Sequence, residues 1–262
     1  EAELQGIVAV SEESIPSASA WSIGVGLFSR FLRLFSLEAS PALKMVQGQT
    51  LASASVPINW AKDFDKAPSG PAVVIGNEFL DCLPIRQAIR HKGQWRERVV
   101  TLHPEDEARF VYGLGPVLGE ADMAFIAPGL READDGTLVE LRPGDQQQID
   151  QLAARFDRDP GYALFVDYGS AKPETGDTLQ AIRAHQKVDP LDAPGTADLT
   201  AWVDFDRLLR LGVDAGLSAF GPMTQGDFLT ELGIEQRAAV LSRSVDEAGQ
   251  AKLKRQMHRL VS

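Results

Sequence analysis

The sequence has 262 residues, of which 44% are hydrophobic and 24% charged, and its formal net charge is −11. These proportions are those of a soluble globular protein with a core of ordinary size, and the acidic balance argues against nonspecific binding to nucleic acids or anionic membranes, which requires a basic face. A single cysteine and four histidines without metal-ligand spacing exclude an internal disulfide and a cysteine-based zinc cluster, so we predict no metal site.

The chain opens with an acidic stretch, EAELQGIVAVSEES, that lacks an initiator methionine. We therefore expect neither a secretory signal nor an arginine-rich transit peptide, and a reducing cytoplasm is the expected compartment. No apolar run approaches the ~20 residues that a membrane-spanning helix needs, so no membrane partner is expected. We divide the chain into a divergent or truncated segment, 1–33, and one domain, 34–262.

Four short apolar runs predict strands, each ending at a polar or glycine-rich corner: 34–38, 56–60, 71–77 and 162–169. The last two are almost continuously apolar, as is typical of strands covered on both faces. Between the first two lies a predicted helix, with Ser40 as its N-cap and Pro41 at its first position. A helix between strands implies βαβ units, so the predicted fold class is α/β with a parallel sheet.

The stretch from about 85 to 143 has a different pattern, in which IRQAIRH and WRERVVTL flank the turn-like HKGQ. Further short apolar segments follow, separated by Gly, Pro and Asp-Gly breaks. We interpret this stretch as an antiparallel β insertion into the main sheet, and as the first place to look for a partner surface.

Helical periodicity follows the insertion. Ile149, Leu152, Ala153 and Phe156 fall on one stripe of a predicted helix that leads into the 162–169 strand. ADLTAWVDFDRLLRLGVDAG predicts another helix, for which we expect Asp198 and Thr200 to provide the N-cap. Two more helices are predicted towards the carboxyl terminus, in FLTELGIEQRAAVLSRS and EAGQAKLKRQMHRLVS.

Polar residues end each predicted strand of the parallel sheet: Glu38, Asn59-Trp60, Asn77-Glu78 and Asp167-Tyr168. In open α/β sheets, ligands bind beyond the carboxyl ends of the strands, so these residues are the candidate site. An acid at such a position can accept hydrogen bonds from both ribose hydroxyls of a nucleoside. The alternative for Glu38 is a solvated acid that starts the following turn.

Six segments in order resemble the MidA-like family of class I S-adenosylmethionine-dependent methyltransferases: LEASPALKMVQ, GNEFLDCLPIRQ, ALFVDYG, DTLQAIRAH, DPLDAPGTADLTAWVDF and GPMTQGDFLTELGIEQRA. The resemblance implies a Rossmann-like sheet with helices on both faces, S-adenosylmethionine as methyl donor, and a protein arginine as acceptor. The family's mitochondrial member assists assembly of respiratory complex I, which implies a complex I subunit as a candidate partner and a mitochondrial location for eukaryotic relatives.

The resemblance also implies roles for individual residues. On the donor side it assigns Glu38 to the cofactor ribose, and Asn59, Trp60 and Asn77 are further cofactor-binding candidates because they end neighbouring strands. On the acceptor side, Asp167, Tyr168 and Asp204 match the family's DYG and VDF motifs, and we expect them to face the substrate. The alternative for Tyr168 is a core residue. Trp202 stands where the family usually has histidine, so no role is carried over to that position.

Glu78 and Asp81 are the predicted catalytic residues. If a helical turn follows the strand, residues three apart share one face, and two carboxylates there can hold a guanidinium through charge-assisted hydrogen bonds. One of them can also receive the proton that arginine must lose. The alternative is that Glu78 and Asp81 only cap the turn that Pro84 ends, and we expect the neighbouring Cys82 to be a buried structural residue.

A glycine-rich cofactor loop is not evident upstream of LEASP. The nearest candidate, WSIGVGLF with Gly24 and Gly26, is only seven residues from the 34–38 strand, whereas a βαβ crossover needs at least ~10–12. A truncated or altered sequence, a divergent loop and a loss of catalysis all remain open. The second hypothesis is therefore a noncatalytic binding or assembly module, and the third is a different nucleoside-dependent enzyme on the same fold.

Overall fold

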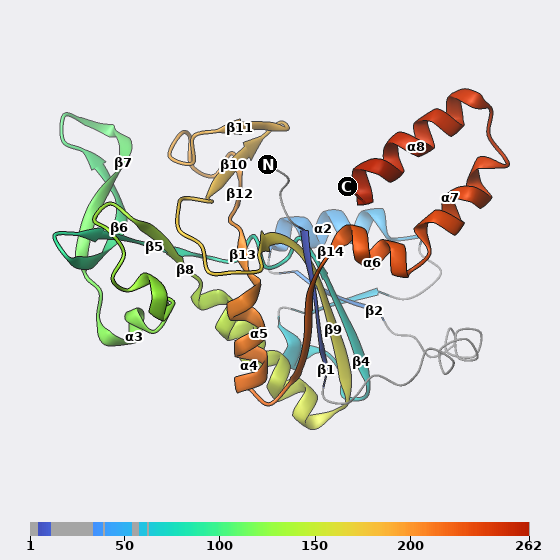
Figure 1. Ribbon diagram of the computed structural model, residues 1–262, viewed down its shortest axis with the longest axis horizontal. Helices are drawn as coiled ribbons and strands as arrows, with labels where there is room; N and C mark the ends of the chain where they lie inside the picture. The colour runs from blue at the N-terminus through green and yellow to red at the C-terminus, as the bar shows by residue number, and fades with distance from the viewer. Residues whose placement is uncertain (1–4, 12–33, 39, 54–57, 62, 262) are drawn as a thin grey trace.

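The computed structural model describes residues 5–11, 34–38, 40–53, 58–61 and 63–261 (Figure 1). Its largest sheet has five strands: β1 (Gln5–Ser11), β4 (Ala72–Asn77), β9 (Gly161–Ser170), β13 (Val203–Asp204) and β14 (Ser218–Thr224). β9 pairs in parallel with β4 and β13 and antiparallel with β1, which pairs antiparallel with β14. The sheet is therefore parallel except for β1. The predicted parallel α/β core is confirmed.

Two helices cover one face of this sheet: α4 (Pro143–Arg158) and α5 (Phe205–Asp214). Their apolar stripes meet alternate residues of β9 in one core, whose buried members include Ile149, Leu152, Phe156, Ala163, Phe165, Phe205 and Leu208. The helix predicted from Ile149, Leu152 and Phe156 is confirmed. On the opposite face of β4, Val73 and Ile75 are 63% and 70% exposed.

The second predicted helix begins later than expected. Asp198 and Thr200 lie on the short strand β12 (Asp198–Thr200), and α5 begins at Phe205 with Asp204 as its N-cap. The expected N-cap was wrong because the ADLT segment pairs with β10 (Gln180–Arg183). β10 also pairs with β11 (Gln186–Val188), so a small antiparallel sheet occupies this region.

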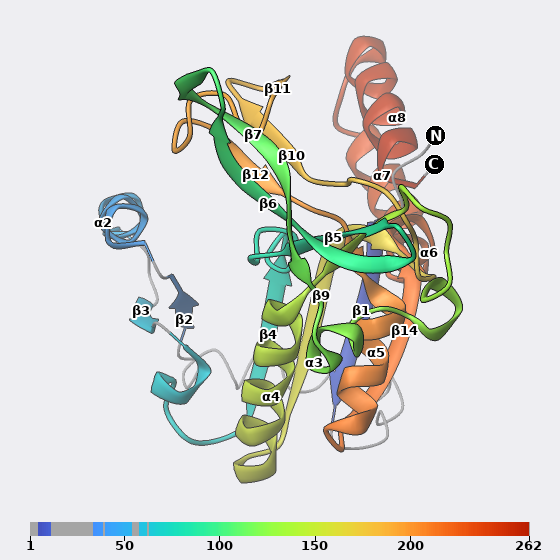
Figure 2. The same ribbon diagram turned by 90° about the vertical axis from the view of Figure 1, so that its left-hand side faces the viewer.

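A βαβ unit precedes β4, as predicted. β2 (Leu34–Leu37) and β3 (Ile58–Ala61) pair in parallel and flank α2 (Pro41–Thr50), and a short 3₁₀ turn, η2 (Phe64–Lys66), follows. The Ser40 side chain caps α2 by accepting a hydrogen bond from the Leu43 amide. Within the described ranges these two strands form a sheet of their own that is not hydrogen-bonded to β4 (Figure 2).

The stretch predicted as an antiparallel insertion forms a four-stranded antiparallel sheet in the order β7-β6-β5-β8. Its strands are β5 (Arg86–His91), β6 (Gln94–His103), β7 (Asp106–Val117) and β8 (Leu138–Leu141). The apolar segment at residues 123–128, MAFIAP, forms no strand. It runs from the end of the short helical turn α3 (Glu120–Met123) to the start of the short helical turn η3 (Pro128–Leu130). Ile126 of this segment joins Trp95 and Val139 in a second core.

Three helices follow β14: α6 (Gln225–Glu231), α7 (Ile234–Ser242) and α8 (Glu247–Val261). They confirm the helical periodicity of the carboxyl-terminal segments. None of the helices in the described ranges is long and apolar enough to cross a membrane. The WSIGVGLF segment lies outside the described residues.

Candidate functional site

The corner after β4 places Glu78 at the carboxyl end of the parallel strands. The Glu78 amide donates a hydrogen bond to the carbonyl of Val166 at 2.8 Å, and its backbone has φ of 50°, in the left-handed region that favours glycine. The hydroxyl of Tyr168 donates to Oε1 of Glu78 at 3.1 Å. The Glu78 side chain is exposed, so its oriented carboxylate faces solvent.

Asp167 supports this corner from inside. Its side chain is fully buried, and Oδ1 accepts hydrogen bonds from the amides of Leu80 and Asp81, both at 3.1 Å. Its other oxygen, Oδ2, is buried and lacks a hydrogen-bond partner among the described residues. Burial, with a smaller contribution from the negative charge of Asp81, raises the pKa of Asp167 to about 7. Asp167 therefore lies beneath the surface to which we had assigned substrate.

Asp81 combines burial with a neighbouring charge. It is 5% exposed, and burial raises the pKa of its carboxyl, as does the nearby Glu78 carboxylate. Its backbone carbonyl accepts a hydrogen bond from the Ala201 amide at 2.9 Å. The structure thus brings together Glu78, Asp81 and Tyr168, with Asp167 behind them. Cys82 is exposed, so the expectation of a buried cysteine was wrong.

Arg142, a buried arginine that we did not predict from the sequence, links the corner after β4 to α4 and to the segment before β13. Nε and Nη2 of Arg142 donate to the two carboxylate oxygens of Asp145 at 2.7 and 3.1 Å. Nη2 also donates to the carbonyl of Leu80 at 2.6 Å, and Nη1 to that of Trp202 at 2.9 Å. Both side chains of the pair are almost completely buried. The RPGD spacing, with an acid in the first helical turn, was the available signal.

Gly169 and Asp204 have structural roles in their motifs. A Cβ on Gly169 would overlap the carbonyl oxygen of Val203, so the absence of a side chain allows β13 to pair with β9. Oδ1 of Asp204 accepts a hydrogen bond from the Arg207 amide at 2.9 Å and caps α5. Burial raises the pKa of Asp204. Its predicted contact with substrate stays a prediction.

The predicted donor residues form a second group. Glu38 Oε1 accepts from the Ser40 amide at 2.8 Å and Oε2 from Nε2 of Gln47 at 2.9 Å. Gln47, which we had not predicted, also accepts a hydrogen bond from Nε1 of Trp60 at 2.8 Å. Asn59 is exposed and, by strand alternation, points away from Trp60.

Asn77 does not join these two groups in the described structure. It ends β4 and is exposed on the strand face that carries Val73 and Ile75. Glu38 and Trp60 belong to the β2–β3 unit, which shares no hydrogen-bonded strand with β4 among the described residues. The predicted acceptor residues Glu78, Asp81 and Tyr168 therefore lie together at one corner, whereas no strand pairing in the described ranges links the predicted donor residues to that corner.

Comparison with known proteins identifies the relatives of this fold. Residues 25–223 match a family described as "Putative S-adenosyl-L-methionine-dependent methyltransferase". The chain belongs to this family. The methyltransferase resemblance seen in the sequence is thereby confirmed.

Several animal proteins named mitochondrial protein arginine methyltransferase NDUFAF7 are similar to the chain. The Xenopus laevis protein is 34% identical over 246 residues, which cover 82% of this chain and 54% of the relative. The human protein is 34% identical over 209 residues, covering 79% of this chain and 45% of the relative. The chain spans about half the length of the curated relatives it matches.

Two solved structures of COG1565 superfamily proteins from Burkholderia thailandensis share the fold. One aligns with a TM-score of 0.70 at 26% identity and covers 88% of this chain and 62% of the other. The second, bound to S-adenosyl-homocysteine, aligns with a TM-score of 0.67 at 25% identity and covers 88% and 59%.

Proposed function

We propose that this chain catalyses methyl transfer from S-adenosylmethionine to an arginine side chain of a protein, with Glu78 holding the guanidinium. Membership of the methyltransferase family and similarity to proteins named protein arginine methyltransferase support this proposal. The observation that carries it is the exposed Glu78 carboxylate, oriented by the Tyr168 hydroxyl and adjoined by the Asp81 carboxyl.

The chemistry of arginine explains why two acids are suitable. The guanidinium is planar and always protonated in water, so a nitrogen lone pair must be made available before a methyl group can be accepted. A Glu78 carboxylate that accepts hydrogen bonds from two N–H groups of the guanidinium draws positive charge towards the nitrogens it contacts, and so leaves the lone pair of the remaining nitrogen more available to the methyl group. As the new N–C bond forms, the nitrogen loses a proton, which Glu78 or Asp81 receives and passes to water.

Asp81 and Asp167 have different parts in this proposal. Because both burial and the Glu78 charge raise the pKa of Asp81, it is the better proton acceptor of the two acids at this corner. Asp167 is fully buried and acts as a positioning residue, since it binds the amides of the turn that carries Asp81. Tyr168 is a positioning residue for Glu78.

The residues present fit part of a nucleoside site. Each oxygen of Glu38 already accepts one hydrogen bond and retains capacity for another, so the carboxylate can still hold the two hydroxyls of a ribose. Trp60 and Gln47 fix the orientation of Glu38 from the side. When bound, S-adenosylmethionine supplies an electrophilic methyl group on a sulfonium. Asn59 and Asn77 stay predicted donor residues, since neither is hydrogen-bonded to Glu38 in the described ranges.

We place the acceptor in the class of proteins with an exposed arginine, and nothing in the acidic composition favours a nucleic acid. The resemblance noted in the sequence makes a respiratory complex I subunit the first acceptor to test. The animal relatives are named as mitochondrial proteins, so we propose that compartment for eukaryotic relatives and the cytoplasm for this chain.

The experiment is a methylation assay with S-adenosylmethionine and arginine-containing peptides. Glu78→Gln keeps the side-chain shape but removes the charge that holds the guanidinium, so its turnover should fall at least about 100-fold. Glu120→Gln, at an exposed position in α3, removes the same charge elsewhere and should leave turnover unchanged. Equal activity of Glu78→Gln and the wild-type chain would remove the assigned role.

One observation favours the alternative of a noncatalytic binding module. The β2–β3 unit that carries Glu38 shares no strand hydrogen bonds with β4 in the described ranges and meets the main core only through packing such as that of Leu37, so the acidic corner could recognise an arginine-bearing segment without a donor. Calorimetric titration separates the alternatives. Saturable heat with S-adenosylmethionine supports the enzyme, and no heat at millimolar ligand supports the binding module.

A further inference from the structure

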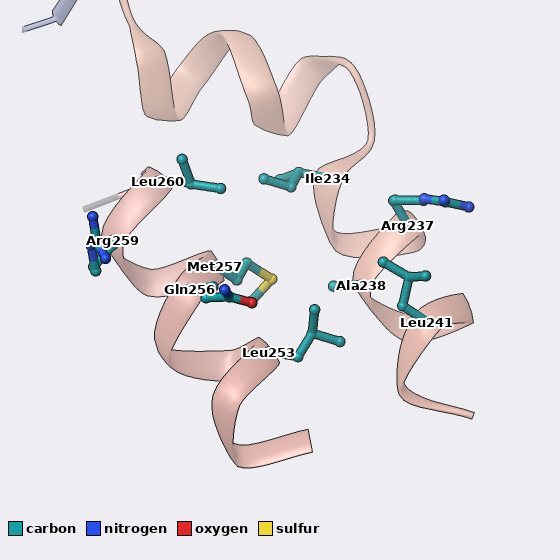
Figure 3. A pocket seen from close by; sticks show the side chains of 9 residues that line it. All are labelled: Ile234, Arg237, Ala238, Leu241, Leu253, Gln256, Met257, Arg259 and Leu260. Carbon is teal, nitrogen blue, oxygen red and sulfur yellow. The ribbon is translucent and has the colours of Figure 1, made fainter. Parts of the chain in front are cut away.

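A groove of about 390 Å³ lies between α7 and α8 (Figure 3). Its walls are mainly apolar and consist of Ile234, Ala238 and Leu241 from α7 and Leu253, Met257 and Leu260 from α8. In each helix the three residues recur at i, i+4 and i+7, and therefore form one stripe. The two stripes face each other across the groove (Figure 3).

The helix α8, which forms one wall of the groove, is held in place by α6, and the mouth of the groove is open to solvent. Gln225 Nε2 donates to the carbonyl of Leu260 at 3.2 Å, and a Cβ on Gly226 would lie 2.7 Å from the Val261 carbonyl, so the end of α8 rests against the start of α6. α7 and α8 pack chiefly on each other and on α6. Leu241 and Leu260 remain 36% and 43% exposed, although apolar side chains gain stability when covered.

The flanks of the groove are basic. Arg237 and Arg259 lie on its opposite sides (Figure 3), and within the described part of the chain neither takes part in an ion pair. Both are exposed. The net charge of the whole chain is −11, so these basic flanks complement an acidic partner better than the rest of the molecule does.

We propose that this groove binds an amphipathic helix of a partner protein that carries acidic residues beside its apolar stripe. Seven residues of helix span about 10 Å, so two turns of the occupant, with apolar residues at i, i+3/i+4 and i+7, match the stripes of the groove. Acidic side chains on its edges would meet Arg237 and Arg259. A symmetric contact with a second copy would instead oppose these arginines, and like charges disfavour it. The proposal is independent of methyl transfer.

The test measures binding of two synthetic 18-residue helices by fluorescence anisotropy at ~0.15 M salt, where distant charges are screened. Both peptides carry leucine at helical spacing, and one has glutamate on its edges where the other has lysine. The variant Arg237→Glu/Arg259→Glu reverses the charge of the groove. Lys252→Glu/Arg255→Glu is the matched control, because it makes the same charge change on exposed residues that do not line the groove.

The wild-type chain should bind the glutamate peptide about tenfold more tightly than the lysine peptide, as expected for two rim ion pairs. The groove variant should reverse this preference, and the control variant should retain it. Equal binding of both peptides, no saturable binding of either at millimolar concentration, or reversal by the control would overturn the proposal. A dimer in sedimentation that the groove variant abolishes would show a second copy as occupant and would also overturn it.

Discussion

The hydroxyl of Tyr168 donates a hydrogen bond to Oε1 of Glu78 at 3.1 Å, and joins the ends of two neighbouring parallel strands that are 90 residues apart in sequence. The next residue back, Asp167, binds the amides of Leu80 and Asp81. Tyr168 and Asp167 therefore both stabilise the corner after β4, Tyr168 from the surface and Asp167 from the core.

Tyr168→Phe should weaken methyl transfer without disturbing the fold. The variant removes one hydrogen bond to the Glu78 carboxylate and keeps the ring, and such a bond contributes about 1 kcal/mol, or roughly fivefold in kcat/KM. The measurement is steady-state kinetics together with urea unfolding. An unchanged kcat/KM would show that Tyr168 does not position Glu78, and Tyr162→Phe on the same strand is the control.

Asp167→Asn should reduce the pH dependence of stability. A carboxyl with a folded pKa of about 7 binds a proton that the unfolded chain releases near pH 4, so the free energy of unfolding falls as the pH rises from about 4 through 7. The full shift corresponds to on the order of 4 kcal/mol. Asparagine keeps the oxygen that accepts from Leu80 and Asp81 but does not titrate.

Urea unfolding at pH 5 and pH 8 measures this effect. The loss of stability between the two pH values should be smaller in Asp167→Asn than in the wild-type chain, and Asp134→Asn, an exposed loop residue, should match the wild type. If Asp167→Asn loses as much stability as the wild type over this range, Asp167 does not carry the proton.

Arg142→Met should be among the most destabilising single substitutions. It leaves the buried Asp145 without its bidentate partner and frees the carbonyls of Leu80 and Trp202, and breaking such a pair costs about 3–5 kcal/mol. Arg183→Met breaks an exposed pair with Asp192 and should cost less than about 1 kcal/mol. If urea unfolding shows comparable losses of stability in the two variants, Arg142 does not stabilise the corner after β4 in the way described.

Gly169→Ala should destabilise the site through packing alone. Its Cβ would overlap the carbonyl of Val203, so β13 must move away from β9, and overpacking of this kind costs about 1–3 kcal/mol. Gly129→Ala is the matched control, because a Cβ there meets no atom within 4 Å. Equal unfolding midpoints for the two variants would show that the close approach is not required.

Local secondary structure was the part of the fold that could be predicted best from the sequence. Continuous apolar runs identified β4 and β9, and Ser40-Pro41 identified the start of α2, because strand pattern and capping depend on neighbouring residues. The start of α5 was misplaced because pairing of ADLT with β10 overrides its helical periodicity.

The sequence indicated which residues lie at the carboxyl edge of the sheet, but not the contacts that hold them there. Glu78 and Asp81 were identified together, but the role of Asp167 depends on amides 86 and 87 residues away, and that of Arg142 on carbonyls about 60 residues to either side. Gln47 was missed because a glutamine on a helix carries no pattern that reveals its link between Glu38 and Trp60.

The most direct measurement is mass spectrometry of two peptide libraries, identical except that one carries arginine where the other carries lysine. Each is incubated with the full chain and S-adenosylmethionine that carries a deuterated methyl group. The account predicts label on arginine, none on lysine, and loss of label in Glu78→Gln. No label on either library, or label on lysine, would contradict it.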